Sequence, residues 1–243
     1  MRPEQVVLVC GTGTEVGKTW VGAQLLFEFR SRGLQVAARK PAQSFDVGAD
    51  DAPLGGDTDA EVLGAASGES PRRVCHPHRS YPRAMAPPMA AVALGLPAFT
   101  IAELIDELAW PDHPTDLGLV ETAGGVRSPQ ASDGDAIDFL VALRPDLVVL
   151  VADAGLGTIN SVRLSMDALA PVVGDLETEA QPSPIPVAVV LDRFYDTDEI
   201  HRHNLEWLAA RDAFEIFTIP GQEASLGDFI LVHRATPLSR RQP

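Results

Sequence analysis

The sequence predicts an α/β fold with a doubly wound, mostly parallel sheet and helices on both faces. Apolar runs of strand length recur along the chain, and several are almost continuous in Val and Leu, as expected of parallel strands covered on both faces. These runs alternate with segments of helix length, which is the pattern of βαβ units. A chain of 243 residues fits one large domain, and we expect a single domain over residues 1–243.

The expected bounds of the strands and helices follow from the apolar runs and from the residues that end them. Strands are expected at residues 5–10, 35–39, 117–120, 147–152, 187–191 and 215–219. Helices are expected at residues 18–32, 59–66, 100–109, 135–143, 159–170, 197–210 and 222–232. Gly33 closes the first helix, because glycine readily adopts the left-handed conformation found at helix ends.

Three segments do not fit the alternation. Residues 70–97 are rich in Pro, Arg and Met, and predict a long connection with one short helix near 84–94; a connection of that length is more often functional than idle. Residues 176–186 hold three prolines and predict a surface linker. The last residues, 234–243, are expected to form a flexible tail.

Charge limits the partners of the chain. The formal net charge is −15, which disfavours a nucleic-acid or anionic membrane surface, because both need clustered Lys and Arg. No stretch approaches the roughly 18 to 20 apolar residues of a membrane span. The N-terminal segment has neither the basic region nor the cleavage site of a signal peptide. We therefore expect a cytoplasmic protein with small-molecule partners, and neither nucleic acid nor membrane as a partner.

The use of lysine is unusual. The chain holds seventeen arginines but only two lysines, Lys18 and Lys40. A composition bias could have spared two positions by chance. The alternative is that each position needs a compact ammonium that a planar guanidinium cannot replace. Both lysines lie in the motifs described next, which favours the functional interpretation.

A glycine-rich loop at residues 11–19 follows the first strand and opens the first helix, with the sequence Gly-Thr-Gly-Thr-Glu-Val-Gly-Lys-Thr. Backbone N–H groups and the positive helix end bind phosphate at such a junction. Gly17 lets the backbone approach phosphate oxygens, Lys18 reaches the β and γ phosphates, and the Thr19 hydroxyl can bind Mg²⁺. The dinucleotide-binding fingerprint fails, because Val16 stands where its third glycine belongs. The loop therefore predicts a site for a nucleoside triphosphate with Mg²⁺.

Together with other segments, this loop resembles dethiobiotin synthetase, a family of the P-loop NTPase superfamily. The matching segments are 40–44 (Lys-Pro-Ala-Gln-Ser), 57–60 (Asp-Thr-Asp-Ala), 81–91, 121–125 (Glu-Thr-Ala-Gly-Gly) and 156–160 (Leu-Gly-Thr-Ile-Asn), in order over about residues 5–169. The resemblance implies the P-loop NTPase fold, a homodimer, and an ATP- and Mg²⁺-dependent ligase of biotin synthesis. That enzyme closes a cyclic urea on 7,8-diaminopelargonic acid with CO₂ or bicarbonate, giving dethiobiotin.

The resemblance also implies a role for each matching residue. Lys40 and Lys18 are expected to be catalytic. Thr14 and Ser44 are expected to bind the substrate, although Ser44 also suits a turn. The residues expected to bind Mg²⁺ are Thr19, Asp59 and Glu121. The residues expected to bind the nucleotide are Glu15, Val16, Gly17, Lys18, Thr19, Trp20, Glu121, Thr122, Ala123, Gly124, Leu191, Asp192, Pro220, Gly221 and Gln222. Whether Asp57 or Asp59 is the metal-side acid stays open, and both also suit a solvated turn and helix cap.

The sequence departs from the family pattern at three places. Phe45 stands where a small residue is usual, and Thr122 replaces a glycine. Leu191-Asp192 occupy the position of an Asn-Asp pair whose asparagine reads adenine. A leucine offers no hydrogen bond to a base, so we predict a relaxed preference among nucleotides. A shift of one residue would instead let Asp192, or backbone groups at 220–222, read the base.

Two other functions compete. A P-loop amidoligase of the cobyrinic acid type usually carries a fused glutaminase domain with a nucleophilic cysteine, and neither cysteine here has that context. A partition-type regulatory ATPase would normally show a second lysine inside its phosphate loop, where this chain has Thr12 and Thr14. Both features favour the ligase.

Overall fold

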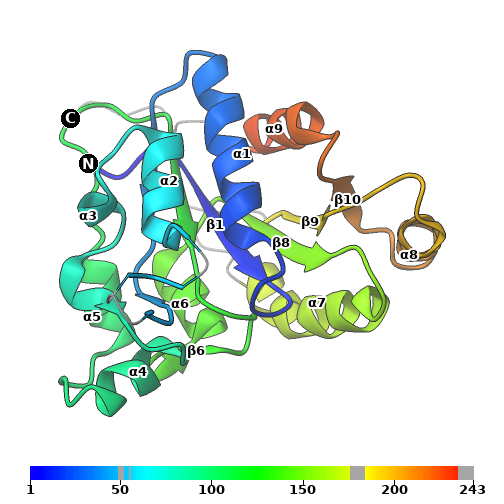
Figure 1. Cartoon of the computed structure of the whole chain (residues 1–243). Coiled ribbons are helices and arrows are strands. Elements are labelled where there is room, and N and C mark those ends of the chain that lie inside the picture. The colour runs from blue at the N-terminus through cyan, green and yellow to red at the C-terminus, as the bar shows by residue number, and fades with distance from the viewer. Residues whose placement is uncertain (49–51, 55, 176–183, 235–243) are drawn as a thin grey trace.

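The central sheet has six parallel strands in a computed structural model of the protein, which describes residues 1–48, 52–54, 56–175 and 184–234 (Figure 1). The strand order is β10-β9-β8-β1-β5-β2, and every neighbouring pair runs parallel. The strands are β1 (Gln5–Gly11), β2 (Val36–Arg39), β5 (Leu117–Glu121), β8 (Leu147–Asp153), β9 (Val187–Asp192) and β10 (Glu215–Thr218). The predicted doubly wound α/β fold is confirmed.

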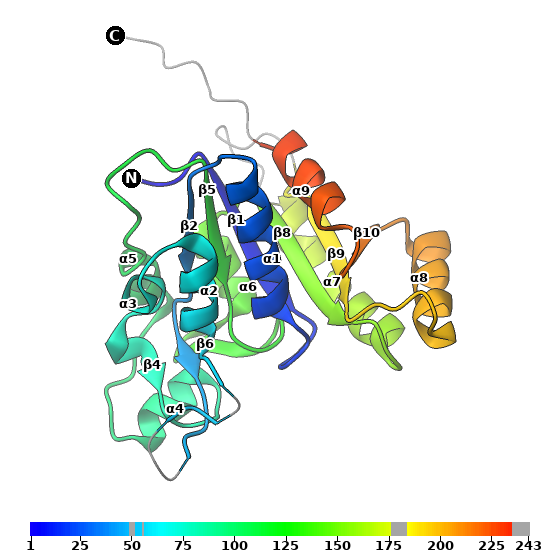
Figure 2. The ribbon, with the colours of Figure 1, turned by 45° about the horizontal axis from the view of Figure 1, so that its top comes forward.

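Helices cover both faces of this sheet (Figure 2). One face carries α1 (Lys18–Ser31), α2 (Asp59–Ser67), α3 (Pro71–Val74) and α9 (Glu223–Val232). The other carries α4 (Pro87–Ala93), α5 (Ile101–Asp106), α6 (Ala136–Leu143), α7 (Thr158–Asp175) and α8 (Glu199–Asp212). None of the helices in the described ranges has the length and apolar character that crossing a bilayer requires.

The strand sequences explain this two-sided packing. Side chains alternate between the faces of a strand, so a strand covered on both faces is apolar at every position. In β1, Val7 and Val9 enter the core beneath α1, while Val6, Leu8 and Cys10 enter the core on the opposite face. All five side chains are buried. The almost continuous apolar runs therefore build two cores that share one sheet.

The connections differ from prediction in detail. Residues 70–97 hold α3, a 3₁₀ turn at Pro77–Arg79, the short strand β4 (Ser80–Tyr81) and α4, rather than a single helix. Strand β4 pairs in parallel with β3 (Gln43–Ser44), and β6 (Pro129–Ala131) pairs with β7 (Gly134–Asp135). Strands this short have no readable periodicity. Most of the expected linker, residues 176–183, and the expected tail from 235 to 243 lie outside the described residues.

The topology brings the loops that follow β1, β2, β5 and β9 to one edge. The chain runs from β1 to β2 on one side and later crosses from β5 to β8 on the other, so its direction across the sheet reverses beside β1. In open α/β sheets, ligands bind in the crevice outside the carboxyl ends of the strands at such a reversal. Most residues predicted from the sequence lie in these loops or at the ends of the adjoining strands and helices, and residues 220–222 follow β10.

Candidate nucleotide-binding and catalytic site

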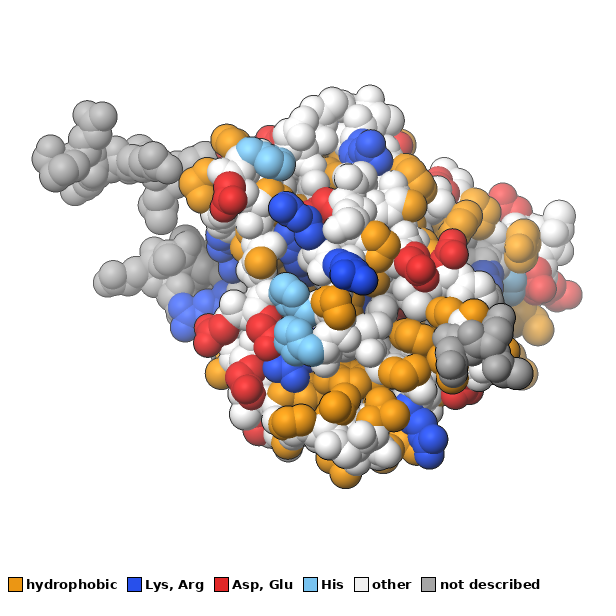
Figure 3. Space-filling view, turned by 60° about the vertical axis from the view of Figure 1, so that its left-hand side comes forward, with side chains coloured by type: hydrophobic (Ala, Val, Ile, Leu, Met, Phe, Trp, Pro, Cys, Tyr) orange, Lys and Arg blue, Asp and Glu red, His pale blue; other side chains and the backbone are white. Residues whose placement is uncertain are grey.

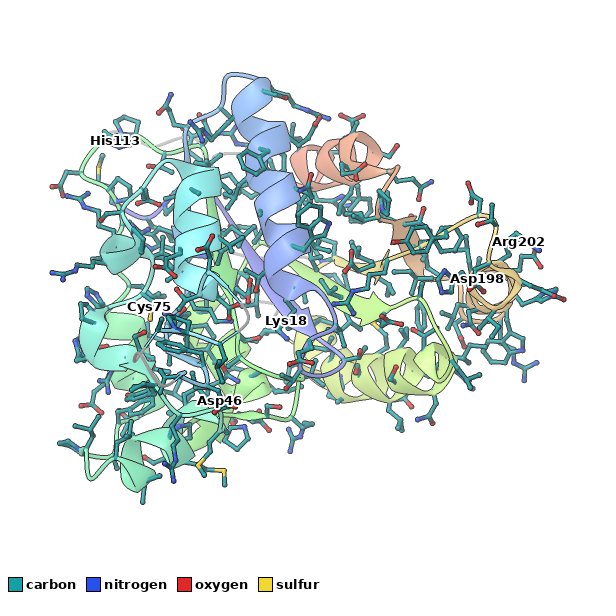
Figure 4. The ribbon with its side chains drawn as sticks, in the orientation of Figure 1. Lys18, Asp46, Cys75, His113, Asp198 and Arg202 are labelled. Carbon is teal, nitrogen blue, oxygen red and sulfur yellow. The ribbon has the colours of Figure 1, made fainter. Side chains whose placement is uncertain are left out.

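The phosphate loop connects β1 to α1, and Lys18 lies at this junction (Figure 4). The loop turns through left-handed backbone at Glu15 (φ 60°) and Gly17 (φ 94°). The Lys18 ammonium donates to the Gly13 carbonyl at 2.8 Å and so curls back over the loop. Burial, followed by the nearby Lys40 charge, holds the pKa of Lys18 below its usual range.

Position 17 requires glycine because of both its backbone conformation and its close contact with Asp192. A Cβ atom at this position would stand 1.9 Å from the Oδ2 atom of Asp192, which ends β9. The backbone of the loop therefore lies directly against the Asp192 carboxylate. Only glycine satisfies both the positive φ and this approach.

Four side chains meet where β2, β5, α1 and α2 converge. The Lys40 ammonium lies 2.5 Å from Glu121 Oε1 and 2.7 Å from Asp59 Oδ2. The Thr19 hydroxyl lies 2.8 Å from Asp59 Oδ1 and 2.9 Å from Glu121 Oε1. These four residues, which we call the Lys40 cluster, bring together positions predicted separately from four sequence segments.

Local structure places each member of the Lys40 cluster. Lys40 follows edge strand β2, and Glu121 is the last residue of β5. Asp59 begins α2, whose start is set by a capping box between Thr58 and Glu61. That cap makes Asp59, rather than the exposed Asp57, the acid that contacts Thr19 and Lys40. The choice left open by the sequence is therefore resolved for these contacts.

The electrostatics of the cluster depend on burial and on the two acids. Burial alone would lower the pKa of Lys40, but the Asp59 and Glu121 carboxylates outweigh it and hold that pKa above its usual range. Burial would raise the pKa of Asp59, but Lys40 and the Thr19 hydroxyl outweigh it and keep that pKa low. Burial raises the pKa of Glu121, against the Lys40 charge. The two carboxylates therefore favour the ammonium form of Lys40.

The donor atoms suit a hard divalent cation. The Thr19 hydroxyl lies within 2.9 Å of both carboxylates, and Glu121 Oε2 is buried without a hydrogen-bond partner among the described residues. Mg²⁺ prefers such oxygens and keeps several waters or phosphate oxygens as further ligands. The described part of the chain has no cluster of three or more His, Cys, Asp or Glu that could hold a metal alone. A cation here would need ligands from the nucleotide or from water.

The segment after β5 closes over the phosphate loop. Thr122 offers its carbonyl to the Lys40 ammonium at 3.4 Å. A Cβ on Gly124, which has φ 66°, would lie 3.8 Å from the Thr14 hydroxyl, so these two predicted residues are neighbours. The side-chain amide of Gln130 donates to and accepts from the Ala123 backbone at 2.7 and 2.9 Å. The sequence did not predict a role for Gln130, because a single glutamine gives no recognisable sequence motif.

The predicted substrate side is joined to the Lys40 cluster by Gln43. Its amide oxygen accepts from the Ala60 N–H at 2.9 Å, and its nitrogen donates to the Ser80 hydroxyl at 2.8 Å. The neighbouring Ser44 hydroxyl donates to the Met85 carbonyl at 2.5 Å. Gln43 was also missed by sequence reasoning, and it fixes α2, β3 and β4 relative to one another.

The residues predicted to face the base differ in how far they are buried. Leu191 is fully buried in the core, and its carbonyl accepts from the Ile219 N–H at 3.0 Å. Asp192 is 2% exposed, its Oδ1 atom has no hydrogen-bond partner within the described ranges, and burial raises its pKa. Residues 220–222 form an exposed turn after β10, in which the Gln222 amide oxygen accepts from the Thr218 N–H at 2.8 Å.

A phosphate loop between β1 and α1, with its lysine and threonine beside two acids at the carboxyl edge of a parallel sheet, defines a P-loop nucleotide-binding protein. A family described as an AAA domain matches residues 5–174. The ATP-dependent dethiobiotin synthetase BioD of Corynebacterium efficiens is 35% identical over 183 residues, covering 74% of this chain and 78% of that protein. The protein of the same name from Rhodococcus jostii is 38% identical over 165 residues, covering 68% of each. The chain belongs to the dethiobiotin synthetase family.

Solved structures agree on the fold. A plasmid partition protein from Borrelia burgdorferi, bound to AMPPNP, superposes with a TM-score of 0.51 at 12% identity, covering 96% of this chain and 98% of that one. The pNOB8 ParA protein superposes with a TM-score of 0.50 at 13% identity, covering 88% and 78%. At this identity the likeness concerns the fold alone.

Proposed function

We propose that this chain is an ATP-dependent dethiobiotin synthetase, which closes a cyclic urea on 7,8-diaminopelargonic acid with CO₂, using ATP and Mg²⁺. The Lys40 cluster is the observation that carries the proposal, because it sets a buried ammonium beside the phosphate loop. The names of the relatives support the same activity and do not favour a cobyrinic-acid amidoligase or a partition-type ATPase. We further propose one domain over residues 1–243, in the cytoplasm, with small molecules rather than nucleic acid or membrane as partners.

The proposed chemistry assigns a task to each residue. One amine of the diamine adds to CO₂ and loses a proton to give a carbamate, whose negative charge the Lys40 ammonium holds. A carbamate oxygen takes the γ-phosphoryl group and ADP leaves, while Lys18 neutralises the transferred charge. The second amine attacks the carbonyl carbon, and phosphate leaves as the ring closes. Thr19, Asp59 and Glu121 would hold Mg²⁺, which screens the phosphate charge when bound.

The decisive assay is phosphate release. We expect release to require the diamine and bicarbonate together, because the phosphoryl acceptor forms only from both. Release that is independent of the diamine would contradict the proposal and favour a regulatory ATPase. Ligation that requires glutamine would instead favour an amidoligase.

A conservative change tests the proposed metal ligand. Glu121→Gln removes the charge and keeps the shape, so the Mg²⁺ concentration for half-maximal activity should rise by about 10- to 100-fold. Asp57→Asn is the matched control, because Asp57 is exposed and lies two residues before Asp59. Normal activity of Glu121→Gln at limiting Mg²⁺ would contradict the assignment.

Nucleotide choice should be loose. The Leu191 side chain lies in the core, while the contacts of the phosphate loop are common to all triphosphates. We expect kcat/KM for CTP, GTP and UTP within roughly tenfold of ATP, about 1.4 kcal/mol. A preference for ATP above about a hundredfold would show that another group reads the base.

A homodimer is proposed chiefly from the family resemblance, with the substrate's carboxylate tail reaching the partner near residues 157–160. Leu156 beside that segment is 90% exposed. Figure 3 also shows apolar side chains gathered at the bottom of one face. Met85, Met89, Val92 and Leu96, which lie in or beside α4, are exposed. Sedimentation should give a dimer, and a monomer fully active at nanomolar concentration would remove the idea.

A further inference from the structure

An exposed indole stands beside the phosphate loop. Trp20 lies in the first turn of α1, directly after Thr19, and is 55% exposed. Its helical neighbours Lys18 and Val21 are buried. A single exposed apolar side chain is ordinary on a protein surface, so its position must decide whether it has a role.

The helix geometry places Trp20 on the exposed side of α1, between two neighbouring helices. Successive residues turn by about 100°, so Arg30 and Glu28 lie about 80° to either side of Trp20. Arg30 donates to the Ala66 carbonyl of α2 at 2.9 Å, and a Cβ on Gly227 of α9 would lie 3.4 Å from Glu28. Trp20 thus projects between α2 and α9, which flank α1 in Figure 1. Helical side chains tilt toward the helix N-terminus, so the indole leans toward the phosphate loop.

A second observation marks a ligand site in the phosphate loop, three residues before Trp20. The Asp192 carboxylate lies against Gly17 in the loop and is 2% exposed, yet its Oδ1 atom has no partner among the described residues. A buried polar atom without a partner is costly, and a ligand donor can satisfy it. The Leu191 side chain, next to it, is withdrawn into the core.

We propose that the Trp20 indole stacks on the nucleobase of the bound triphosphate, supplying affinity for the nucleoside without selecting the base. The inference rests on the proposed nucleotide-dependent function and adds a specificity-determining residue to it. Every base has a π-face, so stacking on an aromatic ring tolerates all four bases. Trp20 would thereby replace the selective hydrogen bond that Leu191 does not make.

Calorimetry with three ligands tests the inference. In the presence of Mg²⁺, Trp20→Ala should weaken both ATP and CTP binding by about 10-fold or more. Tripolyphosphate, which has no base, should bind Trp20→Ala within about twofold of the unaltered protein, and Trp20→Phe should retain most of the nucleotide affinity. Phe27→Ala is the matched control, because Phe27 is 49% exposed two turns along the same helix. It should leave all three affinities unchanged.

Two results would overturn the inference. One is ATP and CTP binding that survives Trp20→Ala within about twofold. The other is an equal loss for tripolyphosphate, which would place the effect on the phosphate loop instead of the base. Failure of the ligase proposal would look different: no diamine-dependent phosphate release, while the loss on Trp20→Ala still requires the base. That combination would support the stacking and remove the ligase.

Discussion

Lys40→Ala should abolish ligation while leaving nucleotide affinity within a few-fold. Lys40 is buried and directly follows β2, where its ammonium contacts Glu121 at 2.5 Å and Asp59 at 2.7 Å. In the proposed function, Lys18 in the loop binds the triphosphate instead. Losing one preorganised charge beside a developing anion typically costs about 10²- to 10³-fold in rate, and loss of the carbamate-holding group should cost at least that. Rapid-quench measurement of phosphate release gives the rate.

The control for Lys40→Ala is the same substitution at Lys18. Lys18→Ala should remove nucleotide binding, which calorimetry with ATP and Mg²⁺ measures. If Lys40→Ala lost as much nucleotide affinity as Lys18→Ala, Lys40 would act on the nucleotide and the assignment would fail. Lys40→Arg should not restore activity, because a planar guanidinium does not fit the space of a buried ammonium.

Gly17→Ala should remove nucleotide binding and destabilise the fold. The residue has φ 94°, and its new Cβ would stand 1.9 Å from Asp192 Oδ2. Left-handed backbone costs a non-glycine residue about 1–2 kcal/mol, and overpacking adds about 1–3 kcal/mol. We therefore expect a loss of about 2–5 kcal/mol in the free energy of unfolding, measured by urea denaturation.

Gly33→Ala separates the cost of left-handed backbone from the cost of the contact with Asp192. Gly33 follows α1 with φ 81°, but its Cβ would meet nothing within 4 Å, so only the backbone cost of about 1–2 kcal/mol applies. Adding Asp192→Ala to Gly17→Ala should recover part of the stability, which a double-mutant cycle measures. Equal destabilisation by both glycine changes, without recovery in the double variant, would show that the contact with Asp192 does not matter.

The sheet was predictable because its central strands are buried apolar runs. The strand expected at 147–152 is Leu147–Asp153, and that at 117–120 is Leu117–Glu121. Helix ends were less predictable: the helix expected at 100–109 ends at Asp106. Strands β3 and β4 pair residues almost forty positions apart, and two-residue strands give no pattern that local periodicity can detect.

The candidate site was predictable at residues that belong to a sequence motif and lie at the carboxyl edge of the sheet. Thr19, Asp59 and Glu121 were expected to bind Mg²⁺ and Lys40 to be catalytic, and the structure joins the four by direct contacts. The supporting amides Gln43 and Gln130 were missed, because each acts through hydrogen bonds to distant backbone or hydroxyl groups. Burial of Leu191 follows from strand alternation, since Val189 enters the same core.

The central place of β1 has a consequence for synthesis on the ribosome. This strand is made first, yet it pairs with β5 and β8, whose final residues are Glu121 and Asp153. The strand therefore lacks its native pairing partners until most of the chain up to β8 has been translated. Non-local parallel pairing forms slowly and leaves apolar segments exposed meanwhile. We expect nascent chains that stop before β8 to be protease-sensitive and held by chaperones, with protection arising abruptly once β8 emerges.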